Sequence, residues 1–106
     1  MVSAETVDDA TTAATIKAVY EKHQYMLDPH GAVAFYALEQ YLSTNPHLYG
    51  ILLETAHPVK FPETVEEATG TKIKMPESVT HLLNKEKKSV LMNADFDAVK
   101  HWLMAQ

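Results

Sequence analysis

The sequence contains no cysteine and no arginine, and each absence excludes a class of function. Without cysteine the chain has no disulfide framework, no zinc finger and no thiol nucleophile, which favours a reducing compartment such as the cytoplasm. Without arginine it lacks the forked guanidinium that reads guanine or clamps a phosphate. The nine basic residues are all scattered lysines and the formal net charge is -5, so we expect no nucleic-acid partner.

Long apolar runs and paired metal ligands are also missing. No segment approaches the ~20 consecutive apolar residues of a membrane span, and the acidic stretch at residues 1–9 does not resemble a signal peptide. No His-x-x-x-His or Glu-x-x-His pair lies on a predicted helix, so we expect neither a membrane partner nor a metal site. The 106 residues are 46% hydrophobic and 22% charged, which predicts a folded chain with one core, interpreted below as a single partial domain.

Apolar periodicity and capping residues predict five helices. Their expected starts are, in order, Asp8 or Asp9, Asp28 before Pro29, Pro62, Pro76 and Asp95. We expect the first helix to run to about residue 25, the second to end near residue 43, and the third to end at Gly70. The side chains predicted to face a core are Thr12, Ile16, Val19 and Tyr20, then Val33, Tyr36, Ala37 and Tyr41, then Val79, Leu82 and Leu83, and finally Phe96, Val99, Trp102 and Leu103.

Two short segments read as strands, at residues 49–54 and 89–92. The run Ile51-Leu52-Leu53 is short, apolar and flanked by turn residues, which favours a strand buried on both faces. The predicted fold class is therefore α/β, helix-rich with a few short parallel strands. Two strands make a poor sheet, so the chain is expected to lack its sheet neighbours and to self-associate through the surface that they would cover.

The best candidate site follows the first predicted strand, because ligands of open α/β sheets collect at the carboxyl ends of strands. There the segment 54–61 places the Thr55 hydroxyl, the His57 imidazole and the Lys60 ammonium within six residues, just before a helix that starts with proline. A structural interpretation of each residue is also open: Thr55 as a turn residue, His57 as a satisfied histidine and Lys60 as a solvated cation.

Two motifs in this chain resemble those of threonine synthases of the bacterial and fungal branch. Residues 55–61, Thr-Ala-His-Pro-Val-Lys-Phe, resemble that family's Thr-Ala-His-Pro-Ala-Lys-Phe, and residues 28–33, Asp-Pro-His-Gly-Ala-Val, resemble its Asp-Pro-His-Thr-Ala-Val. The resemblance covers nearly the whole chain and places it in the C-terminal part of the family. Two departures are Gly31 for threonine and Val59 for alanine, and the first puts a hydroxyl contact at position 31 in doubt.

The resemblance implies a pyridoxal-phosphate enzyme of fold type II that converts O-phosphohomoserine and water to threonine and phosphate. In that fold a serine or threonine hydroxyl commonly meets the pyridine nitrogen, and the matching residue is Thr55. Asp28, His30, His57 and Lys60 are implied as further residues that line the site or contact substrate.

The resemblance also implies that this chain holds only part of a site. The family's Schiff-base lysine lies far upstream, between a phenylalanine and an aspartate, and none of the nine lysines here has that setting. Gly31, Gly50 and Gly70 stand singly, so a glycine-rich phosphate loop is absent too. We therefore expect the isolated chain to be an inactive C-terminal fragment; the alternative is a free-standing α/β interaction or ligand-binding module derived from the enzyme by fission.

Overall fold

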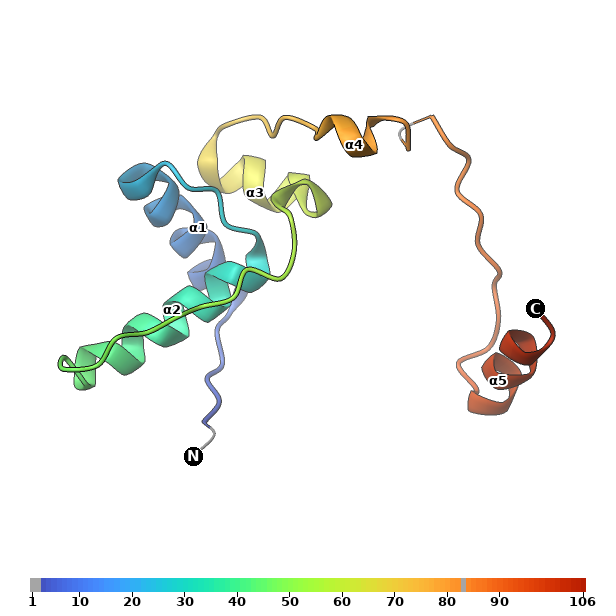
Figure 1. Ribbon diagram of the computed structural model, residues 1–106, viewed down its shortest axis with the longest axis horizontal. Coiled ribbons are helices and arrows are strands. Elements are labelled where there is room, and N and C mark those ends of the chain that lie inside the picture. The colour runs from blue at the N-terminus through green and yellow to red at the C-terminus, as the bar shows by residue number, and fades with distance from the viewer. Residues whose placement is uncertain (1–2, 83) are drawn as a thin grey trace. The chain divides into compact units, whose positions relative to one another are not determined.

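The computed structural model describes residues 3–82 and 84–106, and within them all regular structure is helical (Figure 1). The elements are α1 (Asp9–His23), α2 (Pro29–Thr44), the 3-10 helix η1 (Pro58–Lys60), α3 (Pro62–Thr69), α4 (Glu77–Thr80) and α5 (Phe96–Met104). They divide into an N-terminal unit that ends at Met75 and a C-terminal unit from Pro76 to Gln106. No helix in the described part of the chain is long and apolar enough to cross a bilayer.

The helices of the N-terminal unit begin where the sequence places their caps. The Asp8 carboxylate accepts a hydrogen bond from the Thr11 amide at 2.7 Å, and this satisfies a free donor in the first turn of α1. Asp28 caps α2 in the same way, with Pro29 at the first helical position. Gly70 ends α3 in the left-handed region, at φ 65°, where a side chain would strain the backbone.

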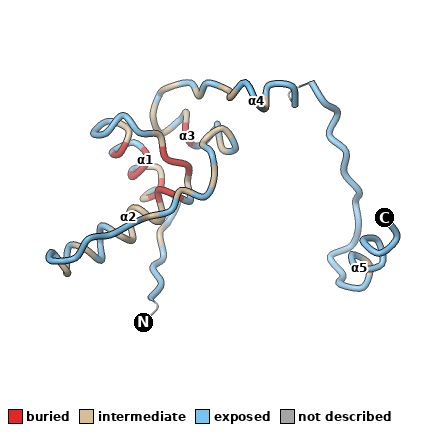
Figure 2. The backbone as a smooth tube through the Cα atoms, viewed as in Figure 1, coloured by how far each residue is buried: buried red, intermediate tan, exposed pale blue. Residues whose placement is uncertain are grey.

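The core of this unit lies where α1, α2 and α3 meet, and the buried positions in Figure 2 gather there. Its members are Ile16, Val19, Leu27, Ala32 and Val65. Phe35, Phe61 and Ile73 are partly buried and pack against it. The helical spacing of Thr12, Ile16 and Val19 places all three on one buried face of α1, which confirms most of the first predicted core face, whereas Tyr20 is only half-buried.

The C-terminal unit is mostly exposed. Asp95 caps α5 by accepting a hydrogen bond from the Ala98 amide at 2.8 Å, as predicted. The side chains predicted to face inward do not, because Phe96, Trp102 and Leu103 are 78%, 39% and 59% exposed. Leu82 is exposed as well, and Leu83 lies outside the described residues. Within the C-terminal unit, this apolar face of α5 is therefore left largely uncovered.

The predicted strands are not found among the described residues. Residues 49–54 and 89–92 carry no ladder of backbone hydrogen bonds, so the α/β class holds here only in its helix-rich part. The segment 49–54 runs back along α2, with Gly50 close to the Leu38 side chain (Figure 1). Ile51 and Leu53 are 90% and 75% exposed rather than buried. A strand requires a neighbouring backbone, and residues 3–82 and 84–106 supply none beside this segment.

The second helix also buries a different face from the one predicted. Its buried residues are Gly31 and Ala32, whereas Val33, Tyr36 and Ala37 are half-buried and Tyr41 is 52% exposed. The fully buried residues of α2 thus lie in its first turn, Phe35 packs partly against the core, and the far end of the helix extends beyond it (Figure 2).

Candidate functional site

Thr55, His57 and Lys60 line one surface hollow of about 620 Å³, and all three side chains are exposed. That volume is within the range of roughly 300–1,000 Å³ that is usual for small-molecule pockets. The remaining residues of this hollow come from the connection between α1 and α2, from the same segment and from the chain after α3; they are Tyr25, Met26, Glu54, Ala56, Pro58 and Ile73. We refer to it as the site hollow.

The backbone of the site hollow is held by a cap on η1. The His57 Nδ1 atom accepts a hydrogen bond from the Val59 amide at 3.1 Å, and Pro58 follows as the first residue of the turn. With Nδ1 acting as an acceptor, a neutral His57 carries its proton on Nε2. Phe61 ends the turn and packs against the core, so the motif 55–61 is anchored at its far end.

The two sequence motifs meet in space. Asp28 is fully buried, and its Oδ1 atom accepts a hydrogen bond from the His30 amide at 2.7 Å and lies 2.8 Å from the His30 Nδ1 atom. The His30 ring in turn packs against Phe61, with 5.1 Å between ring centroids. Neither Asp28 nor His30 is among the residues that line the site hollow; Asp28 is buried, whereas the His30 side chain is 61% exposed.

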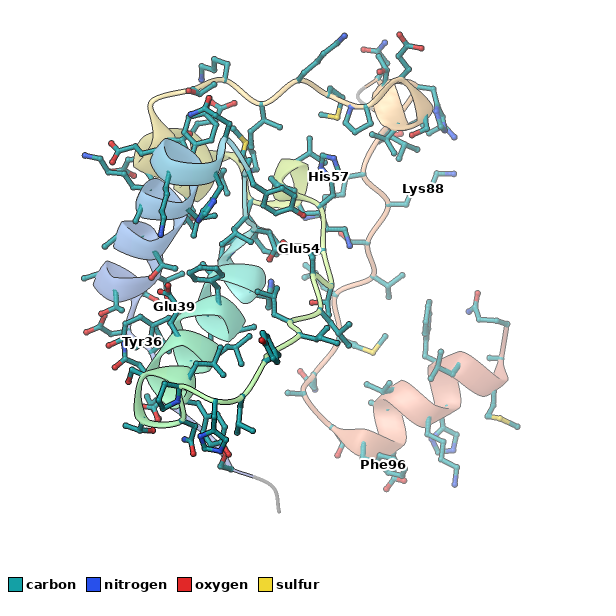
Figure 3. All side chains as sticks on the ribbon, turned by 60° about the vertical axis from the view of Figure 1, so that its left-hand side comes forward. Tyr36, Glu39, Glu54, His57, Lys88 and Phe96 are labelled. Carbon is teal, nitrogen blue, oxygen red and sulfur yellow. The ribbon has the colours of Figure 1, made fainter. Side chains whose placement is uncertain are left out.

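Glu54 joins the motifs at their other end. Its Oε1 atom accepts a hydrogen bond from the Asp28 amide at 3.0 Å, which connects residues 26 positions apart. Figure 3 shows Glu54 and His57 along the segment that leads from α2 to η1. Because Glu54 immediately precedes Thr55, its side chain holds the start of the site segment against the first turn of α2.

The two carboxyl groups perturb each other. Burial raises the pKa of Glu54 from 4.5 to about 7, and the nearby Asp28 carboxylate acts in the same direction, whereas the hydrogen bond that the Asp28 amide donates to Glu54 acts in the opposite direction. Burial alone would also raise the pKa of Asp28. The neighbouring Glu54 side chain and the hydrogen bonds from the His30 amide and ring outweigh that effect and lower this pKa below 3.8.

Sequence reasoning identified the segment but missed the role of Glu54. Two features of the sequence could have indicated this contact: Gly31 replaces the threonine of the resembled motif, and a glutamate stands just before Thr55. A metal site was not expected, and no group of three potential ligands is found in the described residues.

Comparison with known proteins identifies the family. The sequence model described as "Threonine synthase, C-terminal" matches residues 31–103. The chain belongs to the threonine synthase family. It is 39% identical over 98 residues to the threonine synthase of Escherichia coli K12, which covers 92% of this chain and 22% of that protein. This chain thus spans about a fifth of the length of the curated threonine synthases that it matches.

Solved threonine synthases share the fold. The crystal structure of the Escherichia coli enzyme superposes with a TM-score of 0.80 at 38% identity, covering 93% of this chain and 22% of that one. A threonine synthase from Brucella melitensis, solved with bound PLP, superposes with a TM-score of 0.63 at 28% identity, covering 89% and 20%. The resemblance first seen in two motifs therefore extends over nearly the whole chain.

Proposed function

We propose that this chain is the C-terminal part of a pyridoxal-phosphate-dependent threonine synthase that acts on O-phosphohomoserine. The observation that supports it best is that the chain of a threonine synthase family member brings Thr55, His57 and Lys60 to one hollow of small-molecule size. The PLP-bound relative supports the choice of cofactor.

The residues of the site hollow suit part of the cofactor. Thr55 offers a neutral hydroxyl, which can bond to the pyridine nitrogen without carrying the charge that would favour a protonated ring. Pyridoxal phosphate supplies an electron sink when it is bound. His57 can donate a hydrogen bond from Nε2, since its Nδ1 is already occupied by the Val59 amide. The exposed Lys60 ammonium is a point charge suited to a phosphate of the substrate.

Asp28 and His30 have a supporting role in this proposal. Neither lines the hollow: Asp28 holds the start of α2, and the His30 ring contacts Phe61. They fix the wall that carries Thr55 rather than touching the substrate, and substitution of His30 is expected to disturb the site through Phe61.

The chain alone is proposed to be inactive, because a covalent bond to the cofactor requires a placed lysine and none of the nine has the sequence setting of the family's lysine. The test supplies O-phosphohomoserine and pyridoxal phosphate to the purified 106-residue chain, alone and together with the upstream region of a threonine synthase that lacks this part. We expect threonine only from the mixture.

Reduction with borohydride provides an independent control. We expect slow labelling of several lysines by pyridoxal phosphate without preference for one site. Stoichiometric labelling of a single lysine, or threonine release by the chain alone above a heat-killed control, would contradict the proposal. A chain that folds alone, binds a partner and never restores activity would favour the interaction module instead.

A further inference from the structure

Asp28 is buried and Glu54 is half-buried at the edge of the site hollow, and the hydrogen bond from the Asp28 amide to Glu54 brings these two acidic residues together. The interactions of one oxygen on each are ordinary: Asp28 Oδ1 accepts from His30, and Glu54 Oε1 accepts from the Asp28 amide. The other two oxygens, Asp28 Oδ2 and Glu54 Oε2, are buried and have no hydrogen-bond partner among the described residues. Unpaired buried carboxylate oxygens are costly, and two like charges at one site cannot both be accommodated.

Gly31 makes room for this arrangement. A Cβ atom added at Gly31 would lie 2.1 Å from Glu54 Oε2 and 2.6 Å from its Cδ atom, well inside van der Waals contact. Any other residue at position 31 would displace the Glu54 carboxyl group from the first turn of α2. Gly31 and Glu54 are thus a matched pair, although 23 positions separate them in the sequence.

We propose that Asp28 and Glu54 share a single proton, and that this pair, seated on Gly31, is a positioning element for the Thr55 segment. One proton turns two unsatisfied acceptors into a donor and an acceptor, with Glu54 protonated and Asp28 ionised. Asp28 is the ionised partner because His30 donates to it through both its amide and its ring. The role of this pair in catalysis rests on the proposed function. The shared proton and the close fit of Glu54 against Gly31 do not depend on it.

The groups around the pair agree with this distribution of charge. Asp28 and His30 face Glu54 from the start of α2, and the upward shift in the pKa of Glu54 supports the same proton position. The other ionisable side chains that line the two hollows beside Glu54 are His23, Tyr25, His57 and Lys60. The Glu54 Oε2 atom itself is buried, so a proton that it carries is shielded from direct contact with water in both hollows.

The first test is a titration of carboxyl carbons by NMR on the 106-residue chain labelled with ¹³C-glutamate, with Glu54 assigned through Glu54→Gln. Glu54 is expected to titrate near pH 7. The amide resonances of Thr55 and Ala56 should shift with the same midpoint, and that shift should vanish in Glu54→Gln, which imitates the protonated form. Titration of Glu54 near its ordinary value of 4.5, or Thr55 shifts that persist in Glu54→Gln, would overturn the proposal.

The second test is a double-variant cycle on Gly31 and Glu54. Gly31→Ala should lower the melting temperature by about 5 °C or more, because overpacking at a single core site is typically destabilising by an amount of that order. The same change made in Glu54→Ala should be neutral or stabilising, since the clash is gone and alanine favours the helix. Should Gly31→Ala fail to fold while the double variant folds, the proposal is supported.

Two outcomes of the cycle would contradict the proposed fit of the Glu54 carboxyl group against Gly31. One is that Gly31→Ala lowers the melting temperature equally in the wild-type and Glu54→Ala backgrounds. The other is that the double variant fails to fold although Glu54→Ala alone does fold. Neither test depends on threonine formation. If the mixture forms no threonine but the titration and the double-variant cycle give the expected results, the proposed function is wrong and the proton-sharing carboxyl pair is supported. If the mixture forms threonine but these two tests give the contrary results, only the carboxyl pair is refuted.

Discussion

Raising the pH from 4.5 to 7 is expected to destabilise this chain relative to its Glu54→Gln variant. The folded-state pKa of Glu54 is raised to about 7, so across this range the folded chain holds a proton that the unfolded chain has released. The resulting stability is fully present below pH 4.5 and is lost as the pH rises through 7. The glutamine side chain of the variant is neutral throughout and provides a constant reference.

The size of the effect follows from one proton. Each pH unit between the unfolded and folded pKa values removes about 1.4 kcal/mol from the free energy of unfolding, or about 3 kcal/mol over the full interval. Water reaches part of the Glu54 side chain, and screening lowers the expected loss to about 1–2 kcal/mol. Asp28 acts in the opposite direction: its lowered pKa gives stability above 3.8 that is lost only as the pH falls further.

The assay is urea unfolding followed by circular dichroism, at one protein concentration and at half-unit steps from about pH 4 to about pH 8. All other titrating groups are common to both proteins, so the difference between their free energies of unfolding isolates Glu54. A difference that stays constant between pH 4.5 and 7 would refute the shared proton.

Three further perturbations test the fold. Ile16→Ala should lower the free energy of unfolding, measured in urea, by about 3 kcal/mol, because Ile16 is fully buried where α1 meets α2 and α3. A decrease of less than about 1 kcal/mol would mean that Ile16 is not part of the core. Asp95→Ala should speed amide exchange in α5 by removing a cap worth about 1 kcal/mol, whereas Asp97→Ala, in the first turn but without that bond, should not. Sedimentation of the isolated chain should show a dimer or larger species that weakens when Ile51 and Leu53 are both changed to lysine, and a compact monomer at all concentrations would exclude a missing packing partner.

Features that depend on neighbouring residues in the sequence could be predicted. The starts of α1, α2 and α5 were found because a capping aspartate bonds to an amide two or three positions away. The first core face followed from helical spacing within α1 alone.

Features that depend on distant or missing partners could not be predicted. Residues 49–54 have the composition of a buried strand, but a strand forms only beside another backbone, and the described part of this chain supplies none. The expected burial of α5 was wrong for the same reason. The Glu54 contact joins residues 26 positions apart, and only the three-dimensional structure shows why position 31 is glycine.

The central claim is that Thr55 meets the cofactor's pyridine nitrogen, and its most direct test is Thr55→Val in the complete threonine synthase that carries this region, with Thr55→Ser as the matched control. Valine keeps the shape and removes the hydroxyl, so stability should fall by only about 1 kcal/mol while turnover and the cofactor absorption spectrum change substantially. Serine keeps the hydroxyl and should retain most of the activity. Wild-type turnover and an unchanged cofactor spectrum in Thr55→Val would contradict the account and leave Thr55 as a turn residue.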